Sequence, residues 1–194
     1  MRATARFGIL MWLALLLAFH VSAQSTQPTL EPTMTFIANT LNSRGIVSWT
    51  TTIDNMAGAK YTTTNSLAQV NADPSTCSLA WTNIKIESRY KTVDTYLVQL
   101  KDVSGIDVQS YSRIMASQSE WKSRVSPETY LVQIKTSTAI RGQRQSYQKD
   151  KLKSKASLPN DHVAKIRFAD DQTATRVADA IRQAAGLCGA TFRP

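Results

Sequence analysis

The middle of this chain alternates apolar and polar residues with a period of two, which is typical of β-strands buried on one face. In residues 46–54, for example, Val47, Trp49 and Ile53 fall on the same side. Turn sequences such as residues 71–75 and 101–105 separate the segments, and short connections favour antiparallel neighbours. Seven segments have strand character: residues 46–54, 60–71, 77–90, 91–100, 106–116, 129–137 and 163–168.

The third of these segments interrupts its own alternation. Trp81 lies on the inward face, whereas Ile84 and Ile86 continue the apolar set only after a change of register. A β-bulge shifts side chains in this way and bends the strand. We therefore predict a bulge near Thr82 and Asn83.

The last strand segment leads into a sequence with the period of an α-helix, from about Asp171 to Leu187. Asp170 or Asp171 can cap its start, and Gly189 suits the left-handed residue that commonly follows a helix. Its apolar residues recur every three or four positions and form one stripe. The stripe consists of Val177, Ala178, Ile181, Ala184, Ala185 and Cys188.

A second, shorter helix is expected near the start of the patterned region. Pro32 suits a first helical turn, and Gly45 would end the helix. Met34, Ile37 and Leu41 share one face between them. Residues 117–128, by contrast, are predicted as a loop with a helical turn.

These elements together predict a mainly β (α+β) fold. Seven antiparallel strands in a chain of this size bend into a barrel or into two nearly orthogonal sheets. One open end must be covered, and the Ala-rich C-terminal helix fits that role. We predict a seven-stranded antiparallel barrel closed by this helix, with a short N-terminal helix.

The first 23 residues have the three parts of a secretory signal peptide. Arg2 and Arg6 form a positive region, residues 7–19 are apolar, and residues 21–23 form a small-x-small cleavage pattern. The alternative is an uncleaved membrane anchor, but the apolar run is short for a span. We expect export to the periplasm or beyond, a mature N-terminus at Gln24 and a fall in formal charge from +9 to +7.

The mature chain is expected to hold one domain. Residues 24–32 form a polar, Pro-containing flexible start, residues 33–189 form the domain, and residues 190–194 form a tail. An exported chain can oxidise its thiols. Cys77 and Cys188 have neither metal-site spacing nor a CxxC pattern. They are predicted to form a structural disulfide, and the alternative is two buried free thiols.

Two stretches resemble a known family. Residues 96–110, YLVQLKDVSGIDVQS, resemble a strand–turn–strand pair of exported bacterial domains of the pleckstrin-homology-like (PH-like) superfold. Residues 166–189 are similar to the ending of those domains, with Phe, acidic residues, an Ala-rich helix and Cys-Gly. The resemblance covers residues 33 to 189 and implies a PH-like barrel. Such domains have no agreed activity, so it implies no mechanism.

The phosphoinositide pocket of eukaryotic PH domains uses basic residues between the first two strands. The corresponding residues here, IDNMAGAKYT, contain one lysine, Lys60. The lipid-headgroup function is therefore not carried over to this chain.

The stretch with the most functional character is residues 141–155, RGQRQSYQKDKLKSK. It contains one acid, Asp150, and Tyr147 and Leu152 are interleaved with the cations. Such a stretch can bind an anionic lipid, glycan or nucleic acid, or it can be a solvated loop or hairpin extension. The candidate anion-binding residues are Arg141, Arg144, Lys149, Lys151, Lys153 and Lys155.

The chain carries no pattern of an enzyme. The mature part has one histidine, His162, and lacks HExxH, GxSxG and Gly-rich phosphate motifs. We expect no catalysis, no metal and no cofactor. The favoured function is a binding or interaction module of the cell envelope, with an anionic surface or an envelope protein as partner. The alternative is a lipocalin-like carrier with an interior cavity.

Overall fold

The computed structural model describes residues 29–53, 59–118, 123–158 and 162–192. The predicted signal peptide, its cleavage before Gln24 and most of the predicted flexible start lie outside these residues. Among the described residues, no helix is both long and apolar enough to cross a membrane.

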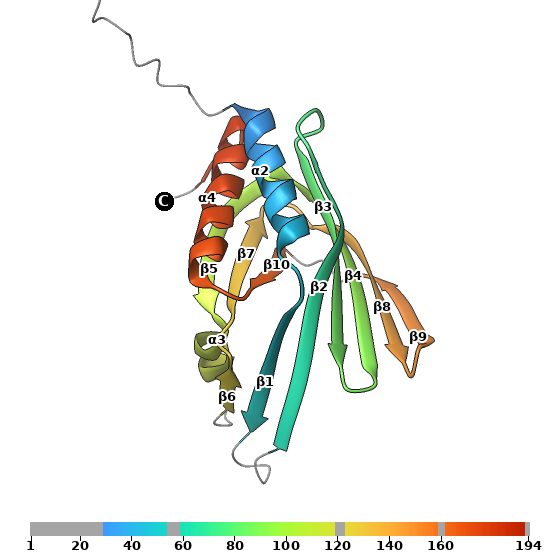
Figure 1. The fold of residues 1–194 in the computed structure, drawn as a ribbon. Coiled ribbons are helices and arrows are strands. Elements are labelled where there is room, and N and C mark those ends of the chain that lie inside the picture. The colour runs from blue at the N-terminus through green and yellow to red at the C-terminus, as the bar shows by residue number, and fades with distance from the viewer. Residues whose placement is uncertain (1–28, 54–58, 119–122, 159–161, 193–194) are drawn as a thin grey trace, which may run out of the picture.

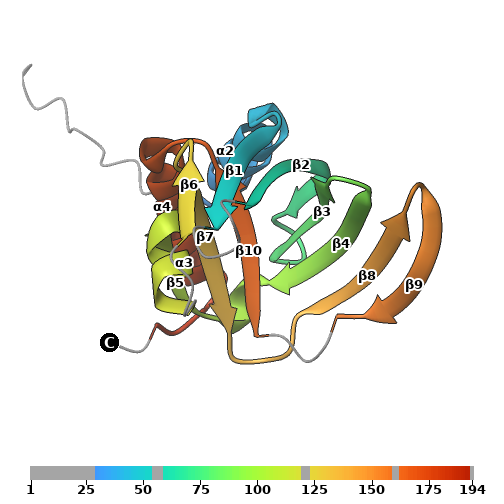
Figure 2. The same ribbon diagram turned by 90° about the horizontal axis from the view of Figure 1, so that it is seen from below.

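The larger of two sheets contains seven strands in the order β6-β1-β2-β3-β4-β8-β9, and every neighbouring pair is antiparallel. Seen from below, this sheet forms an open arc that runs from β1 through β4 to β9 (Figure 2). Its strands are β1 (Val47–Ile53), β2 (Ala59–Asp73), β3 (Ser78–Glu87), β4 (Tyr90–Gln99), β6 (Ser123–Ser126), β8 (Arg141–Gln148) and β9 (Lys151–Ser157).

The smaller sheet has three strands in the order β10-β7-β5, and a layer of helices covers one side of this sheet (Figure 1). Helices α2 and α4 lie side by side, and α4 contacts all three strands of this sheet. The remaining elements are α2 (Leu30–Ser43), the 3₁₀ turn η1 (Leu100–Asp102), β5 (Val103–Ser110), α3 (Tyr111–Gln118), β7 (Tyr130–Thr136), β10 (Val163–Phe168) and α4 (Asp171–Leu187).

The prediction of a closed seven-stranded barrel is wrong, although all seven predicted strands are present. Strand β4 pairs with β3 on one edge and with β8 on the other, so no edge of β4 is left for β5. The turn η1 instead carries the chain into the second sheet, where β5 pairs with β7. The described residues thus form two open sheets with ten strands in all.

The three strands that the pattern missed are β6, β8 and β9, and they share a polar sequence. Strand β9, for example, reads KLKSKAS and has all seven residues exposed. A strand with no buried face leaves no apolar alternation to detect. The segment 106–116 also ends differently than predicted, because helix α3 begins at Tyr111.

The predicted bulge lies on the neighbouring strand. The register between β2 and β3 shifts between Ala68 and Asn71, and Gln69 there has a φ of 53°. The pairing of β3 with β4, in contrast, is continuous. Ile86 is 43% exposed and does not point inward as predicted. The change of pattern at Thr82 therefore means that Ile86 lies on the opposite face of β3 from Trp81. The extra residues of the bulge lie in β2.

Helix α4 matches its prediction. Asp170 is the N-cap, and its Oδ1 accepts from the backbone N–H of Thr173 at 2.7 Å. Gly189 has a φ of +87°, which a residue with a Cβ rarely adopts. The apolar stripe is buried in the main core, with Val177, Ile181 and Ala184 fully covered. The helix therefore stabilises the fold through one face packed on the smaller sheet.

The N-terminal helix and the disulfide are also confirmed. In α2, the residues Met34, Ile37 and Leu41 are buried in the same core as α4. Cys77 and Cys188 are bonded, with their Cα atoms 5.9 Å apart. This bond joins the turn between β2 and β3 to the end of α4, so it links the larger sheet to the helical layer.

Candidate functional site

The predicted basic stretch forms a β-hairpin at the outer edge of the larger sheet (Figures 1 and 2). Arg141 and Arg144 lie on β8, and Lys149 lies in the turn. The other three predicted cations, Lys151, Lys153 and Lys155, lie on β9, which is the edge strand. The stretch is thus an ordered hairpin and not a loop.

Two features fix this hairpin to β4. The Arg144 guanidinium donates to both carboxylate oxygens of Asp94, at 2.7 Å from Nε and 2.9 Å from Nη2. At Gly142 the strands approach so closely that a Cβ would collide with the carbonyl oxygen of Thr95 and with Leu158. Asp94 is buried, and a bidentate pair of this kind is among the stronger ones. Arg144 therefore anchors the hairpin and is not a free cation for a ligand.

The β3–β4 connection lies beside the hairpin turn and adds two cations to it, Arg89 in the turn and Lys91 near the start of β4. The backbone N–H of Lys149 donates to the carbonyl of Arg89 at 3.0 Å. Lys91 is opposite Tyr147 in the register, and its Nζ lies 5.6 Å from that ring. The sequence does not connect Arg89 and Lys91 with the basic stretch, because only the pairing of β8 with β4 brings them together.

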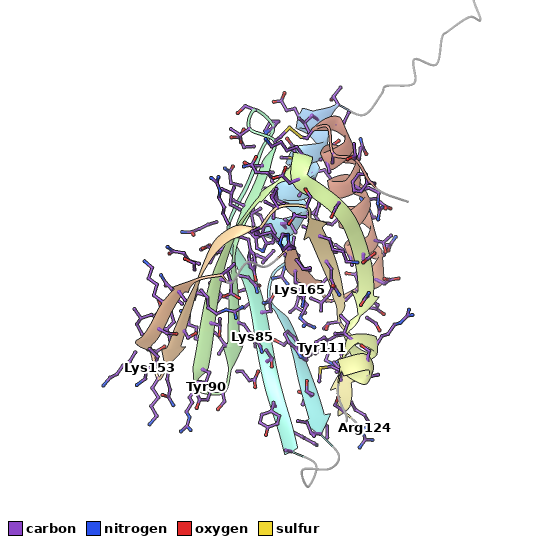
Figure 3. All side chains as sticks on the ribbon, turned by 180° about the vertical axis from the view of Figure 1, so that it is seen from behind. Lys85, Tyr90, Tyr111, Arg124, Lys153 and Lys165 are labelled. Carbon is purple, nitrogen blue, oxygen red and sulfur yellow. A yellow bond between two sulfur atoms is a disulfide. The ribbon has the colours of Figure 1, made fainter. Side chains whose placement is uncertain are left out.

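We call the resulting set the basic hairpin surface. Its one nearby acid within the hairpin is Asp150, which is exposed. The surface also exposes two large side chains, Tyr90 at 50% and Leu152 at 54%. Tyr90 and Lys153 both lie toward the same end of the sheet (Figure 3). The cations of this surface are Arg89, Lys91, Arg141, Lys149, Lys151, Lys153 and Lys155.

A second polar cluster surrounds Arg167 on β10. Its guanidinium lies between two aromatic rings, 3.8 Å from the centroid of Trp49 and 3.9 Å from that of Tyr111. Its Nη1 donates to Thr129 Oγ1 at 2.6 Å. The cation thus contacts the faces of two rings, an arrangement that stabilises a partly desolvated guanidinium.

Arg44, which follows α2, lies next to this cluster. It donates from Nη1 to the carbonyl of Arg167 at 2.6 Å and from Nη2 to Asn65 Oδ1 at 3.0 Å. The pKa of both arginines is lowered to about 10, chiefly by burial, and for Arg44 the charge of Arg167 contributes to that shift. No described carboxylate forms a salt bridge with either guanidinium. Positive charge is therefore concentrated where α2 meets β10.

Sequence reasoning missed this cluster because it treated Trp49 as core and did not consider Arg44 or Arg167. One signal was present in the sequence. In the last strand, Arg167 alternates with Ile166 and Phe168, which are buried in the core. It therefore had to face away from α4, toward the larger sheet.

Glu128 is the acid whose charge acts on Arg167. Burial would raise the pKa of Glu128, but the Ser112 side chain outweighs it together with hydrogen bonds from the backbone N–H groups of Ser112 and Thr129. These bonds are 3.1 and 3.0 Å long, and they hold the pKa below the usual 4.5. The carboxylate is thus stabilised in its charged form by the folded state.

This shift predicts a pH effect for Glu128→Gln. Because the folded pKa is lowered, the carboxylate stabilises the fold above its unfolded pKa of 4.5, and this contribution is lost as pH falls through the folded pKa. The variant should melt below wild type at about pH 6, and the difference in Tm should shrink at about pH 3. Thermal melts at both pH values measure it, and an equal difference at both would contradict the role of the charge.

The described residues offer little for metal or acid–base chemistry. They contain no cluster of three or more His, Cys, Asp or Glu side chains placed to hold a metal ion. His162 is exposed, and its Nδ1 lies 3.2 Å from the carbonyl oxygen of Thr136. Comparisons of this chain with protein-family models, curated proteins and solved structures found no match.

Proposed function

We propose that this protein is an envelope binding module whose basic hairpin surface docks onto an anionic membrane. The observation that carries the proposal is the exposed edge strand β9. All seven of its residues are exposed, three of them are lysines, and Leu152 stands among them. A lysine near an anionic lipid surface contributes about 1 kcal/mol to binding.

The mixture of side chains favours a membrane over a soluble polyanion. Leu152 and Tyr90 can enter the interface while the lysines contact the headgroups, as in peripheral proteins that combine apolar and basic side chains. Two rings that a nucleic acid could stack on each have a cation of the protein nearby. Arg89 lies 5.6 Å from the ring of Tyr90, and Lys91 lies at the same distance from Tyr147.

The PH-like identity and export are parts of the same proposal. The seven strands that the sequence predicts fall into a group of four, β1 to β4, and a group of three, β5, β7 and β10. Helix α4 follows and packs on the second group, which supports a divergent PH-like domain with the β8–β9 hairpin inserted before its last strand. The Cys77–Cys188 bond is compatible with an oxidising compartment. No catalysis is proposed.

A vesicle-binding experiment tests the membrane proposal. The protein should bind vesicles that contain phosphatidylglycerol and should bind pure phosphatidylcholine vesicles weakly. Its affinity should fall as salt rises, because salt screens the charges and the screening length is about 8 Å at physiological salt. Replacing Lys151, Lys153 and Lys155 with Gln should weaken binding about a hundredfold, since three lysines contribute about 3 kcal/mol. Co-sedimentation across a lipid titration measures the effect.

The matched control removes three exposed cations elsewhere: Lys60, Lys101 and Arg113. Arg89 and Lys91 are unsuitable as control positions, because they belong to the basic hairpin surface. If both variants lost the same affinity for vesicles, the effect would come from the overall charge of the protein and not from the lysines of β9. Unchanged binding with new self-association would mean that the lysines only protect an open sheet edge from other chains. Binding to heparin or DNA but not to vesicles would also overturn the proposal.

A further inference from the structure

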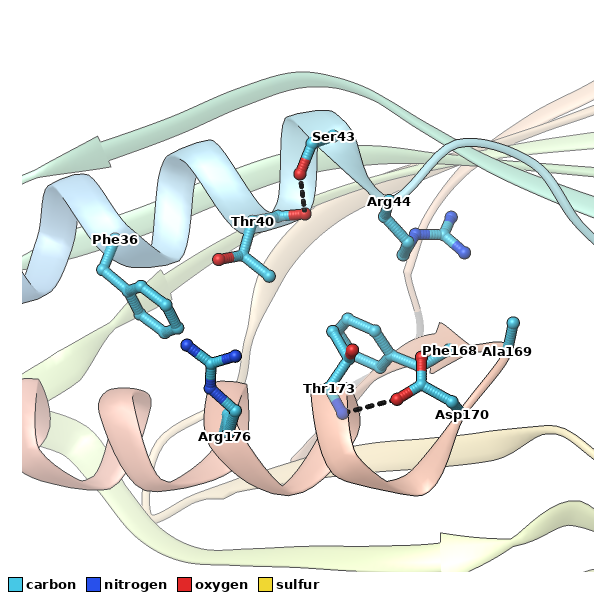
Figure 4. Close-up of a pocket in the computed structure, with 9 residues that line it drawn as sticks. All are labelled: Phe36, Thr40, Ser43, Arg44, Phe168, Ala169, Asp170, Thr173 and Arg176. Carbon is cyan, nitrogen blue, oxygen red and sulfur yellow. Dashed lines mark hydrogen bonds between the residues drawn. The ribbon is translucent and has the colours of Figure 1, made fainter.

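The seam between α2 and α4 holds two adjoining pockets of different character. The first has a volume of about 330 Å³ and is lined by Thr40, Ser43, Thr173 and two arginines, Arg44 and Arg176, among others (Figure 4). The second is a more open hollow of about 420 Å³, lined by the apolar Pro32 and Ala180 and by polar residues that include Asp179. Small-molecule sites begin at about 300 Å³, so each pocket can hold part of a ligand.

Phe36 on α2 and Arg176 on α4 line both pockets and therefore mark the junction between them. The Arg176 side chain points across the seam toward Phe36 and Thr40 (Figure 4). Its guanidinium lies 5.4 Å from the centroid of the Phe36 ring. A cation thus lies where the two pockets meet, beside the apolar side chains Phe36, Pro32 and Ala180 of the second.

Arg176 has no salt bridge with any described carboxylate. Asp179, three residues further along α4, is placed to neutralise it, but that carboxylate pairs with Arg182 at 2.5 Å. Asp170 also lines the first pocket, where its Oδ1 accepts from Thr173 N as the helix cap. It lies toward the Phe168 end, away from Arg176 (Figure 4). Asp179 also lines the second pocket, so Arg176 is the cation at the junction and the acid beside it is already paired with Arg182.

The two helices are held in place before any ligand arrives. Gln183 Nε2 donates to Thr33 Oγ1 across the seam at 3.2 Å, within the lining of the second pocket. The disulfide at Cys188 fixes the far end of α4. A site whose walls are already fixed loses less conformational entropy when a ligand binds.

From these contacts we infer that the α2–α4 seam binds a small amphipathic anion. Its carboxylate or phosphate lies in the first pocket and accepts from Arg176, with the hydroxyl of Thr40 nearby. Its apolar part lies in the second pocket against Phe36, Pro32 and Ala180. Arg44 also lines the first pocket, and its charge adds to the attraction because no described carboxylate forms a salt bridge with it. This site is separate from the basic hairpin surface and does not depend on membrane binding.

Calorimetric titration of the purified protein with octanoate, octyl phosphate and octanol tests the site. Both anions should bind, and the neutral alcohol should bind at least tenfold more weakly, because a hydrogen bond to a charged group is lost. In a series from hexanoate to decanoate, each added methylene should raise affinity up to about fourfold. Comparing octanoate with octyl phosphate shows which anion the site prefers.

Arg176→Gln should lower octanoate affinity about tenfold to a hundredfold and leave octanol binding unchanged. Arg113→Gln removes an exposed cation from α3 and is the matched control, with no expected effect. Chemical shifts of wild-type protein during the titration give a readout that needs no variant. They should move at Phe36 and Ala180.

Any of the following results would overturn the inference. Octanol could bind as tightly as octanoate, Arg113→Gln could weaken binding as much as Arg176→Gln, or the shifts could move at the hairpin instead of the seam. Absence of octanoate and octyl phosphate binding at millimolar concentration would also overturn it.

Discussion

Replacing Ile181 with Asp is expected to lower the free energy of unfolding by about 5 kcal/mol or more. Ile181 is fully buried on α4, where the helix packs on the smaller sheet. Removing a buried isoleucine side chain alone costs about 2–5 kcal/mol. The new carboxylate adds the cost of burying a charge without a partner. Because domains are typically stable by about 5–15 kcal/mol, much of the variant should be unfolded. Urea denaturation followed by circular dichroism measures the loss.

Thr175→Asp is the matched control. It places the same charge on the same helix at an exposed position, where substitutions usually change stability by less than about 0.5 kcal/mol. If Ile181→Asp melted like wild type, α4 would not be packed as described. Equal losses in both variants would point to the charge on the helix, and not to burial, as the cause.

Removing the disulfide should have the second-largest effect. In the Cys77→Ala/Cys188→Ala double variant, no bond closes the unfolded chain into a loop that spans 111 residues. The conformational entropy of the unfolded chain is therefore higher. The chain-entropy model puts that gain at about 4–5 kcal/mol, and measured losses in small exported domains are about 2–5 kcal/mol. Denaturant melts of the oxidised wild type and the variant measure the difference.

Wild-type protein reduced with dithiothreitol provides the control, because it loses the bond without changing the side-chain volumes. It should melt close to the double variant. A loss below about 1 kcal/mol in both samples would mean that the unfolded chain is already constrained near Cys77 and Cys188 by residual structure.

The helical layer could be predicted from sequence because its signals are local. The stripe of α4, its N-cap at Asp170 and the left-handed Gly189 lie within one short segment. The same holds for the seven strands with a buried face. The disulfide could be predicted from the expected export and from the spacing of the cysteines, since the sequence has two cysteines.

The closure of the sheet and the sites could not be predicted, because they depend on contacts between distant segments. The barrel fails at one point, where β8 pairs with β4 in the place that β5 would need. The same pairing places Arg89 next to Lys149 and lets Arg144 form its salt bridge with Asp94. The sequence of a polar strand does not show which strand it pairs with. The residues of the α2–α4 seam likewise come from opposite ends of the described chain.

That seam has a kinetic consequence. Strands β1 to β4 form a meander in which each contact joins neighbouring segments, whereas α2 and α4 meet only after nearly the whole described chain has been brought together. Bringing distant segments together costs loop-closure entropy before any contact forms, and such topologies fold slowly. We expect folding to start in the meander and to finish when α4 docks. Until then the apolar stripe of α4 is the surface most exposed to aggregation, and the one that a chaperone would cover.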